Sequence, residues 1–368
     1  MFDEWMPVRG FFFGIHPDSA MDAFQIGDRS IGPDEPTFVI AEAGSNHNGD
    51  LETAKELIDV AVAAGADAVK FQTFRATDMY VEDSGSVEYL DDGTIYDLLE
   101  SLEMPYEWIP KLHEYCRNQE IYFMSTPFDE RSADELAEYV PAWKVASYTS
   151  SHHPFLRYLA ETDKPILMST GAHELNEIAE SVDVLDNEDV TDLVLLQCVA
   201  AYPAPLEDIN VRVIETLREE FGVLTGLSDH TLDPVTAPTA AVSLGASVVE
   251  KHFTLDKSME GPDHQFALEP DQLDDMVTAI RNTETALGTA DKYVLNVEEK
   301  LHDLARRRVH ATTDIEAGDT LTEDNVGVLR SGRQTNGLHP KFYDELLGKV
   351  AERQIPKDSG ITWDDVEN

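Results

Sequence analysis

The stretch VLTGLSDHTLDPVTAPTAAVSLGASVVEKHFTLDKSMEGPDH, residues 223–264, decides the fold of this chain. Its apolar segments Val223–Leu227 and Ala246–Val249 are typical of buried strands, and the segment between them has apolar residues at helical spacing. Each strand runs into a histidine, His230 or His252. A right-handed β–α–β unit places both strand ends at the same edge of a parallel sheet. The stretch therefore predicts two imidazoles at neighbouring strand ends.

The same alternation of strands and helices extends upstream. Strand-like segments occur at residues 37–44, 67–73, 121–127, 142–147, 164–170 and 192–199, and helix-like periodic segments separate nearly all of them. With the two strands above, this pattern matches the eight repeats over roughly 250 residues of a (β/α)8 barrel. A doubly wound sheet is the alternative, but no Gly-x-Gly-x-x-Gly follows any of these strands. We therefore predict an α/β fold of the TIM-barrel type.

The character of the sequence divides the chain into four parts. Residues 1–36 form an irregular N-terminal extension, and residues 37–288 carry the barrel pattern. A charged linker follows at residues 289–304. Residues 305–368 contain short β-like runs separated by Ala-Gly-Asp and Lys-Asp-Ser-Gly turns, which predicts a separate, small β-rich domain.

The composition is strongly acidic. The 368 residues include 72 Asp and Glu against 27 Lys and Arg, a formal net charge of −45. We interpret this excess as the solvated surface of a halophilic protein, and it argues against binding to nucleic acid or to an anionic membrane. The chain has 2 cysteines, so a disulfide framework is not expected. We find no signal peptide and no run of the ~20 apolar residues that span a bilayer, so we expect a cytoplasmic protein.

Polar residues at the predicted strand ends suggest an anion site. Lys70 and Lys144 lie inside otherwise apolar strands, where lysine is rare without a partner. The hydroxyl residues at the same edge are Thr126, Ser147, Ser169 and Ser228. Cations and hydroxyl donors together favour a phosphate and carboxylate pocket. The alternative is that these groups are structural and satisfy one another at the barrel rim.

Three further strand-end residues suggest acid–base or metal chemistry. His230 and His252 could share a divalent cation, with positions left for water and a carbonyl oxygen. Each could instead be a hydrogen-bonded core histidine. Glu42 ends the first barrel strand and could be a general acid or base, or else a partner of Lys70 in a salt bridge.

These residues lie in motifs that resemble the sialic acid synthase family, N-acetylneuraminate synthase and related nonulosonate synthases. The motifs are AEAGSNHNGD, DAVKFQTF, FMSTPFD, MSTG, YPAPLEDIN, GLSDHT, VEKHFT and GPDH, in this order along the chain. The tail resembles the antifreeze-like or SAF domain of that family through DIEAGDTLTEDNV and LLGKVAERQIPKDSGITWDDV.

The resemblance implies condensation of phosphoenolpyruvate with an N-acyl hexosamine, such as N-acetylmannosamine, to a nine-carbon 2-keto sugar acid with release of phosphate. It implies a divalent metal on His230 and His252, with Mn2+ expected and Mg2+ or Co2+ as alternatives, and a catalytic role for Glu42. It assigns phosphoenolpyruvate contacts to Lys70, Thr126, Lys144, Ser147, Ser169 and Ser228, and sugar contacts to Gln72, Tyr202 and Asp263. Arg330 of the tail would reach the sugar across a domain-swapped homodimer.

Three departures from the family pattern concern the substrate pocket. Ala200 stands where a polar Asn is common, Thr149 stands in place of a Glu, and Ser331 replaces the Pro of an Arg-Pro-Gly motif. A legionaminate or pseudaminate synthase therefore stays open as the product class. Two functions outside nonulosonate synthesis also stay open, those of a pyruvate-dependent aldolase and of a non-catalytic sugar-binding homologue.

Overall fold

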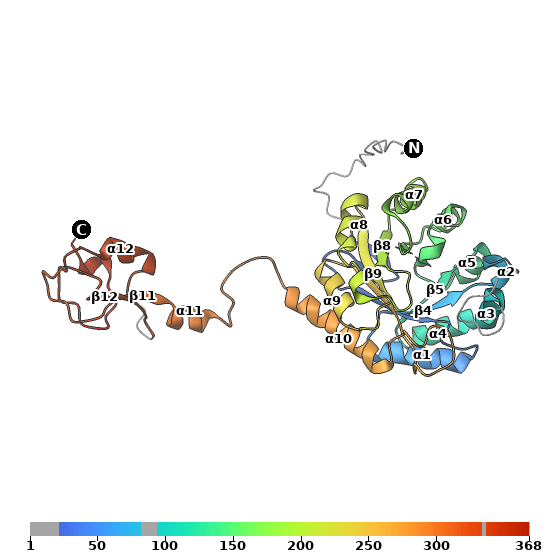
Figure 1. Cartoon of the computed structure of the whole chain (residues 1–368), viewed down its shortest axis with the longest axis horizontal. Coiled ribbons are helices and arrows are strands. Elements are labelled where there is room, and N and C mark those ends of the chain that lie inside the picture. The colour runs from blue at the N-terminus through green and yellow to red at the C-terminus, as the bar shows by residue number, and fades with distance from the viewer. Residues whose placement is uncertain (1–21, 82–93, 333–335, 368) are drawn as a thin grey trace, which may run out of the picture. The chain divides into compact units, whose positions relative to one another are not determined.

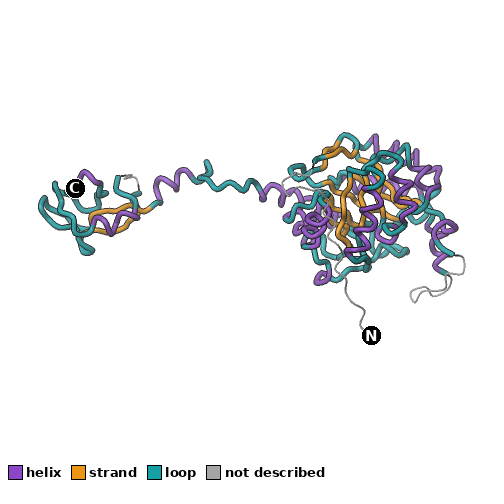
Figure 2. Tube along the Cα trace, turned by 90° about the horizontal axis from the view of Figure 1, so that it is seen from above, coloured by secondary structure: helices purple, strands orange, loops and turns teal. Residues whose placement is uncertain are grey.

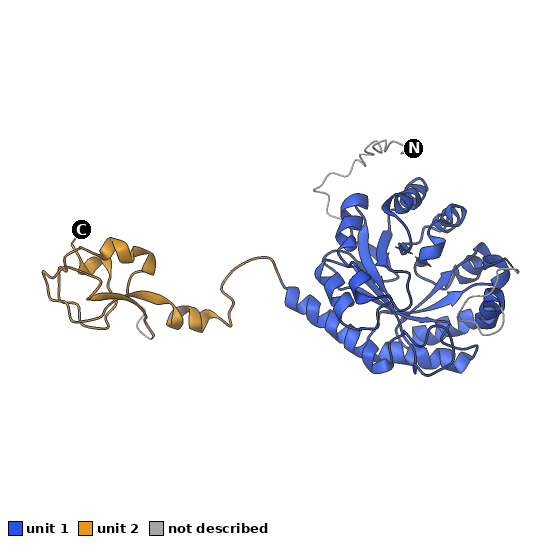
Figure 3. Ribbon diagram, viewed as in Figure 1, with its two compact units in different colours: residues 1–288 blue, residues 289–368 orange. Residues whose placement is uncertain are grey.

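The computed structural model describes residues 22–81, 94–332 and 336–367. The chain divides into two compact units, Met1–Gly288 and Thr289–Asn368, which Figure 3 distinguishes by colour. Each unit has a hydrophobic core of its own.

The first unit is a barrel of parallel strands. In sequence order the strands are β3 (Phe38–Gly44), β4 (Ala68–Thr73), β5 (Tyr122–Pro127), β6 (Trp143–Val145), β7 (Ile166–Ser169), β8 (Leu193–Cys198), β9 (Leu224–Asp229) and β10 (Val248–His252). They hydrogen-bond in the order β5-β4-β3-β10-β9-β8-β7-β6, and the two outermost strands, β5 and β6, contact each other. The sheet is thus nearly closed (Figure 1), which confirms the predicted fold class.

Helices surround this sheet, as the tube in Figure 2 shows. They are α1 (Leu51–Ala63), α4 (Ile109–Asn118), α5 (Glu130–Leu136), α6 (His153–Ala160), α7 (Leu175–Asp186), α8 (Val213–Phe221), α9 (Thr236–Ser243) and α10 (Pro270–Leu287). The side chain of Asp50 accepts a hydrogen bond from the Thr53 amide and caps α1. Short helices α2 (Ala76–Met79) and α3 (Ile95–Leu102) lie in the insertion after β4, of which residues 82–93 are outside the described part of the chain. Among the described helices, none is both long and apolar enough to cross a membrane.

A small hairpin closes the N-terminal end of the barrel. Strands β1 (Phe24–Ile26) and β2 (Arg29–Ile31) pair antiparallel, and Ile26 and Ile31 pack among interior barrel residues such as Met124. Within the described residues, the predicted irregular extension therefore contains a hairpin at residues 24–31. Three-residue strands are too short to show a periodicity that sequence reasoning can use.

The second unit is small and has short strands. Strands β11 (Arg307–Ala311) and β12 (Val326–Arg330) pair antiparallel, and isolated bridges link further segments to them. Its helices are α11 (Glu299–Ala305) and α12 (Tyr343–Leu346). Val309, Ile315 and Leu321 lie at the centre of its core.

Candidate active site

The C-terminal ends of the barrel strands form a pocket. It is lined by Glu42, Lys70, Gln72, Thr126, Phe128, Lys144, Ala146, Ser147, Ser169, Cys198, Tyr202, Ser228, His230, Glu250 and His252. The structure thus brings together the strand-end residues predicted from sequence. Asp263 lies beside the pocket, with Oδ2 3.9 Å from Nδ1 of His252. Arg330 ends β12 and so belongs to the other unit.

This pocket is small, about 50 Å3. A water molecule takes roughly 30 Å3 in the liquid, so the pocket has room for one ionised group of a substrate rather than a whole sugar acid. Tyr202, which also lines the pocket, is 49% exposed. The remaining bulk of a substrate would therefore lie among the loops that follow the strands.

Two lysines and two glutamates form the floor. Lys70 Nζ lies 2.7 Å from Glu42 Oε2 and 3.6 Å from Glu250 Oε2, and Lys144 Nζ lies 3.4 Å from Glu250 Oε1. All four side chains are buried. Strand register explains the cluster, because Glu42 of β3 is the cross-strand neighbour of both Lys70 in β4 and His252 in β10.

Glu250 is the functional candidate that sequence reasoning missed. It lies two residues before His252 on β10, so both side chains point to the same face of the sheet. Its carboxylate stands between the two lysines and accepts a hydrogen bond from Ser228 Oγ at 3.0 Å. The sequence feature that could have identified Glu250 is its spacing of two residues from His252.

The pocket shifts the ionisation of these groups. Burial raises the pKa of Glu42 to about 7, against the lowering effect of Lys70. Burial also lowers the pKa of Lys144 below its usual value, which Glu250 partly offsets. For Lys70 burial is outweighed by the two carboxylates, so its pKa lies above the usual value. Glu42 can therefore hold a proton near neutral pH, as a general acid or base must.

The hydroxyl groups extend the polar floor. Lys70 Nζ donates to Thr126 Oγ1 at 2.7 Å, and Lys144 Nζ donates to Ser169 Oγ at 2.8 Å. Ser147 Oγ accepts a hydrogen bond from the Gly171 amide at 3.0 Å. These contacts satisfy the groups in the absence of a ligand. They also place ammonium and hydroxyl donors side by side, the arrangement that suits a phosphate or carboxylate.

His230 and His252 lie next to each other at the pocket wall. Their ring centroids are 5.6 Å apart, and the Tyr202 ring lies 4.1 Å from that of His230. Nδ1 of His230 lies 2.8 Å from the Val199 carbonyl oxygen, which requires a proton on Nδ1 and leaves Nε2 with its lone pair in the neutral ring. Gln72 reaches the same region and donates to Glu42 Oε1 at 3.0 Å.

This pair of imidazoles fits a divalent metal. Burial lowers the pKa of His252 well below its usual value, and its buried Nδ1 has no hydrogen-bond partner among the described residues. For His230, burial is outweighed by Cys198 and the Val199 carbonyl, and the pKa is raised, so a proton would compete with a metal for this ring. Within the described ranges, no group of three or more His, Cys, Asp and Glu side chains could hold a metal. Water and substrate oxygens would have to complete the coordination.

His47 and Cys198 are two further buried residues of the barrel unit. His47 is buried outside the pocket, where its Nδ1 accepts the Gly49 amide hydrogen at 3.1 Å and its ring meets Trp108 edge-on. Burial lowers its pKa to about 4. Cys198 is buried and also lines the pocket, with Sγ 3.8 Å from His230 Nδ1.

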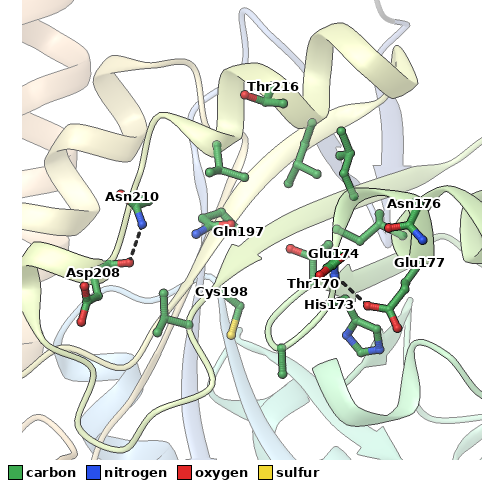
Figure 4. A pocket seen from close by; sticks show the side chains of 16 residues that line it. Thr170, His173, Glu174, Asn176, Glu177, Gln197, Cys198, Asp208, Asn210 and Thr216 are labelled. Atoms are coloured by element: carbon green, nitrogen blue, oxygen red, sulfur yellow. Dashed lines mark hydrogen bonds between the residues drawn. The ribbon is translucent and has the colours of Figure 1, made fainter. Parts of the chain in front are cut away.

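A wider cavity of about 880 Å3 opens between the segments around α7 and α8 (Figure 4). Glu174, Glu177 and Asp208 contribute to its lining, and Cys198 borders both this cavity and the strand-end pocket. The predicted site residues do not line it. Its acidic walls disfavour a phosphate-bearing substrate, so we place the chemistry in the smaller pocket.

The structure shows the surroundings of the three residues that depart from the family motifs. Ala200 lies against Gly171, where a Cβ added to the glycine would be 3.3 Å from the alanine Cβ. Thr149 is buried in the turn after β6, and Ser331 Oγ pairs with Nε2 of His310 at 2.9 Å. The serine is thus held by a hydrogen bond within its own unit.

Comparisons with known proteins agree with this architecture. The NeuB family matches residues 57–292, and the SAF domain matches residues 306–367. The spore coat polysaccharide biosynthesis protein SpsE of Bacillus subtilis is 44% identical over 364 residues, covering 94% of this chain and 98% of that protein. Pseudaminic acid synthase of Campylobacter jejuni is 39% identical over 340 residues, covering 90% of this chain and 96% of the enzyme.

A solved structure extends the likeness to the fold. The N-acetylneuraminic acid synthetase of Leptospira borgpetersenii is 30% identical, with a TM-score of 0.69, and the match covers 78% of this chain and 98% of that one. The extent of these matches, together with the strand-end pocket, shows that the chain belongs to the NeuB family and ends in a SAF domain.

Proposed function

We propose that the protein condenses phosphoenolpyruvate with an N-acyl hexosamine, N-acetylmannosamine or a modified relative, to a nine-carbon 2-keto sugar acid and releases phosphate. The observation that carries the proposal is the buried cluster of Lys70 and Lys144 beside two neighbouring imidazoles at the strand ends. A metal-dependent aldolase acting on pyruvate would have no use for two buried lysines lined with hydroxyls.

The charges of the pocket set a condition for binding phosphoenolpyruvate. Without ligand, the carboxyl groups of Glu42 and Glu250 face the ammonium groups of Lys70 and Lys144. An incoming phosphate and carboxylate therefore meet no excess of positive charge. A proton on Glu42, whose pKa burial raises to about 7, reduces the negative charge. A divalent ion would add the remaining positive charge.

His230 and His252 would hold that ion, for which we propose Mn2+, with Mg2+ and Co2+ as alternatives. When bound, it would polarise the aldehyde carbonyl of the open-chain sugar as a Lewis acid. Gln72 and Tyr202 line the pocket and Asp263 lies beside His252, and these three residues would orient the sugar.

The remaining chemistry uses the residues of the floor. Lys70, Lys144 and their hydroxyl neighbours would hold the phosphate and carboxylate while the alkene carbon forms a bond to the aldehyde carbon. Glu42 is placed to transfer a proton during this step. Water then adds to the former enol carbon, and the C–O bond to phosphate breaks to give the ketone.

We further propose a homodimer in which the C-terminal unit of one copy supplies Arg330 to the sugar site of the other. Apolar side chains of the segment before β11 support an interface, because Tyr293, Val297 and Leu301 are 56%, 86% and 65% exposed in the single chain. Exposed apolar residues that gather on one surface commonly mark interaction sites, and these three lie within nine residues of sequence.

The test is phosphate release from phosphoenolpyruvate in high salt with Mn2+, against a panel of 2-acylamino sugars. The panel includes N-acetylmannosamine and the diacylated dideoxy sugars of a legionaminate or pseudaminate synthase. Release that requires one sugar supports the reaction and identifies the substrate. The Ala200 and Thr149 departures favour a second candidate, a non-catalytic sugar-binding homologue. Absence of release with every sugar, from folded and metal-loaded protein, would count against the proposed reaction and favour that second candidate.

A further inference from the structure

A buried ion pair lies behind the two imidazoles, and the proposed reaction does not use it. Lys251 Nζ is 2.5 Å from Asp229 Oδ2, and the two side chains are 2% and 0% exposed. The residues are cross-strand neighbours in the register of β9 and β10. Because side chains alternate along a strand, Lys251 points to the opposite face of the sheet from Glu250 and His252.

The ion pair is part of a closed ring of hydrogen bonds around His230. The Thr231 amide donates to Asp229 Oδ1 at 2.9 Å, and Thr231 Oγ1 donates to Asp229 Oδ2 at 3.1 Å. Lys251 Nζ donates to the Thr231 carbonyl at 2.5 Å and approaches Thr231 Oγ1 at 3.2 Å. The residues before and after His230 are thus tied to each other and to the strand that carries His252.

Stability alone is a weak reason for such an arrangement. Removing two charges from water is costly, and well-packed apolar residues often replace a buried ion pair at no loss of stability. Here the donors of Lys251 and both oxygens of Asp229 are used within the ring, so neither group is available to a ligand. The ring of hydrogen bonds instead fixes the backbone on either side of His230.

We propose that Asp229, Thr231 and Lys251 form a clamp that positions His230 relative to His252 for binding a divalent ion. The inference rests on the proposed metal site. The Val199 carbonyl holds the His230 ring through Nδ1, and the clamp holds its backbone, so that both the ring and its attachment are fixed. Such outer partners commonly govern metal affinity by 10–100-fold. All three are positioning residues.

The test compares a clamp variant with a matched control in the full-length protein. The double variant Asp229→Asn/Lys251→Met removes both charges and avoids leaving one of them buried alone. Arg281→Met is the control, because Arg281 also pairs with a carboxylate, Asp67 at 2.8 Å, and with a backbone carbonyl, that of Thr37 at 2.7 Å. The measurements are the Kd for Mn2+ by calorimetry, the absorption spectrum of bound Co2+, and the Tm without metal.

We expect the double variant to raise the Kd for Mn2+ at least tenfold and to change the Co2+ spectrum, while Arg281→Met stays within twofold of the wild type. A folded double variant with an unchanged Kd and Co2+ spectrum would overturn the clamp and leave the proposed reaction intact. A folded wild type that binds neither ion would overturn the metal site and the clamp together.

A milder variant decides the question if the double variant does not fold. Thr231→Val removes the three Oγ1 contacts, with Asp229, Lys251 and the Asp233 carbonyl, and keeps the ion pair. Thr225→Val is its control, since the buried Thr225 Oγ1 has no hydrogen-bond partner among the described residues. A Kd raised threefold or more by Thr231→Val, with Thr225→Val unchanged, supports the clamp. Equal values in the two variants reject it.

Discussion

Replacing Glu42 by glutamine tests whether this residue carries a proton or serves as a permanent partner of Lys70. The structure shows both features, since Oε2 lies 2.7 Å from Lys70 Nζ while burial raises the pKa of the carboxyl to about 7. Glutamine has nearly the same shape, keeps an acceptor for the Gln72 amide, and cannot ionise. The variant should therefore fold and differ from the wild type in a pH-dependent way.

The magnitude follows from the two pKa values. The folded-state value of about 7 lies above the ordinary value of 4.5, so between these pH values the folded chain holds a proton that the unfolded chain has released. Wild-type stability must then fall as the pH rises through this window. One pKa unit corresponds to about 1.36 kcal/mol, so the difference of about 2.5 between the folded and unfolded pKa values corresponds to about 3 kcal/mol. The glutamine variant lacks this loss and should gain that much stability relative to the wild type between pH 4.5 and pH 8.

The assay is urea unfolding of both proteins at pH 4.5 and pH 8 in the same concentration of KCl, followed by circular dichroism. Glu52→Gln, which removes an exposed carboxylate from its 2.6 Å pair with Lys55, is the control. Phosphate release should fall at least ~100-fold in the Glu42 variant, the usual contribution of a general acid or base. A stability difference that is the same at both pH values would show that folding does not raise the pKa of Glu42. Near-wild-type turnover would remove its catalytic role.

Four further outcomes are expected. His230→Ala and His252→Ala should each lose bound Mn2+ in equilibrium dialysis, and unchanged metal content in both would refute the site. Lys144→Met should raise the KM for phosphoenolpyruvate at least tenfold, because it removes a buried cation that bonds Ser169 in the floor, and an equal rise in the KM for the sugar would contradict this assignment. Gly226→Ala should destabilise the barrel by about 2–4 kcal/mol in chemical denaturation, because the added Cβ would lie 2.3 Å from the Val248 carbonyl oxygen, and an unchanged midpoint would contradict that packing. With a net charge of −45, raising KCl from about 0.1 to 1 M should raise the Tm by about 5 °C in calorimetry, whereas a flat or falling Tm would argue against repulsion between surface carboxylates.

The barrel was predictable because each strand is a short apolar run and each helix shows a 3.6-residue period. The errors lie where such periodicity is weak. After β8 a 3-10 turn at Leu206–Asp208 follows Pro205, and the regular helix α8 begins only at Val213, a boundary that the apolar spacing does not mark. The hairpin of β1 and β2 has three residues in each strand. Its core contacts come from interior barrel residues that are distant in sequence, such as Met124. Long-range burial of this kind has no local signature.

The site was predictable to the extent that the polar residues interrupt apolar strands. Lys70 and Lys144 stood out for this reason, and the strand ends gathered them as expected of a barrel. Glu250 did not stand out, because a glutamate beside a lysine reads as an ordinary surface pair. Its burial between two lysines depends on strand register, which pairs Glu250 of β10 with Ser228 of β9 and Ile40 of β3. Register is a property of the assembled sheet.

Lys251 shows what a buried charge in a strand does and does not indicate. By composition it resembles Lys70 and Lys144, yet it lies on the other face of the sheet and is bonded completely within the protein. Position along the strand distinguishes Lys251 from the two pocket lysines. Lys251 is adjacent to His252, and adjacent residues of a strand point to opposite faces. This rule can be used only when the face of one residue in the strand is already known. Here that residue is His252, whose imidazole faces the pocket. A buried lysine therefore indicates a ligand site when its own face of the strand opens on a cavity, and it indicates a positioning role when that face is closed.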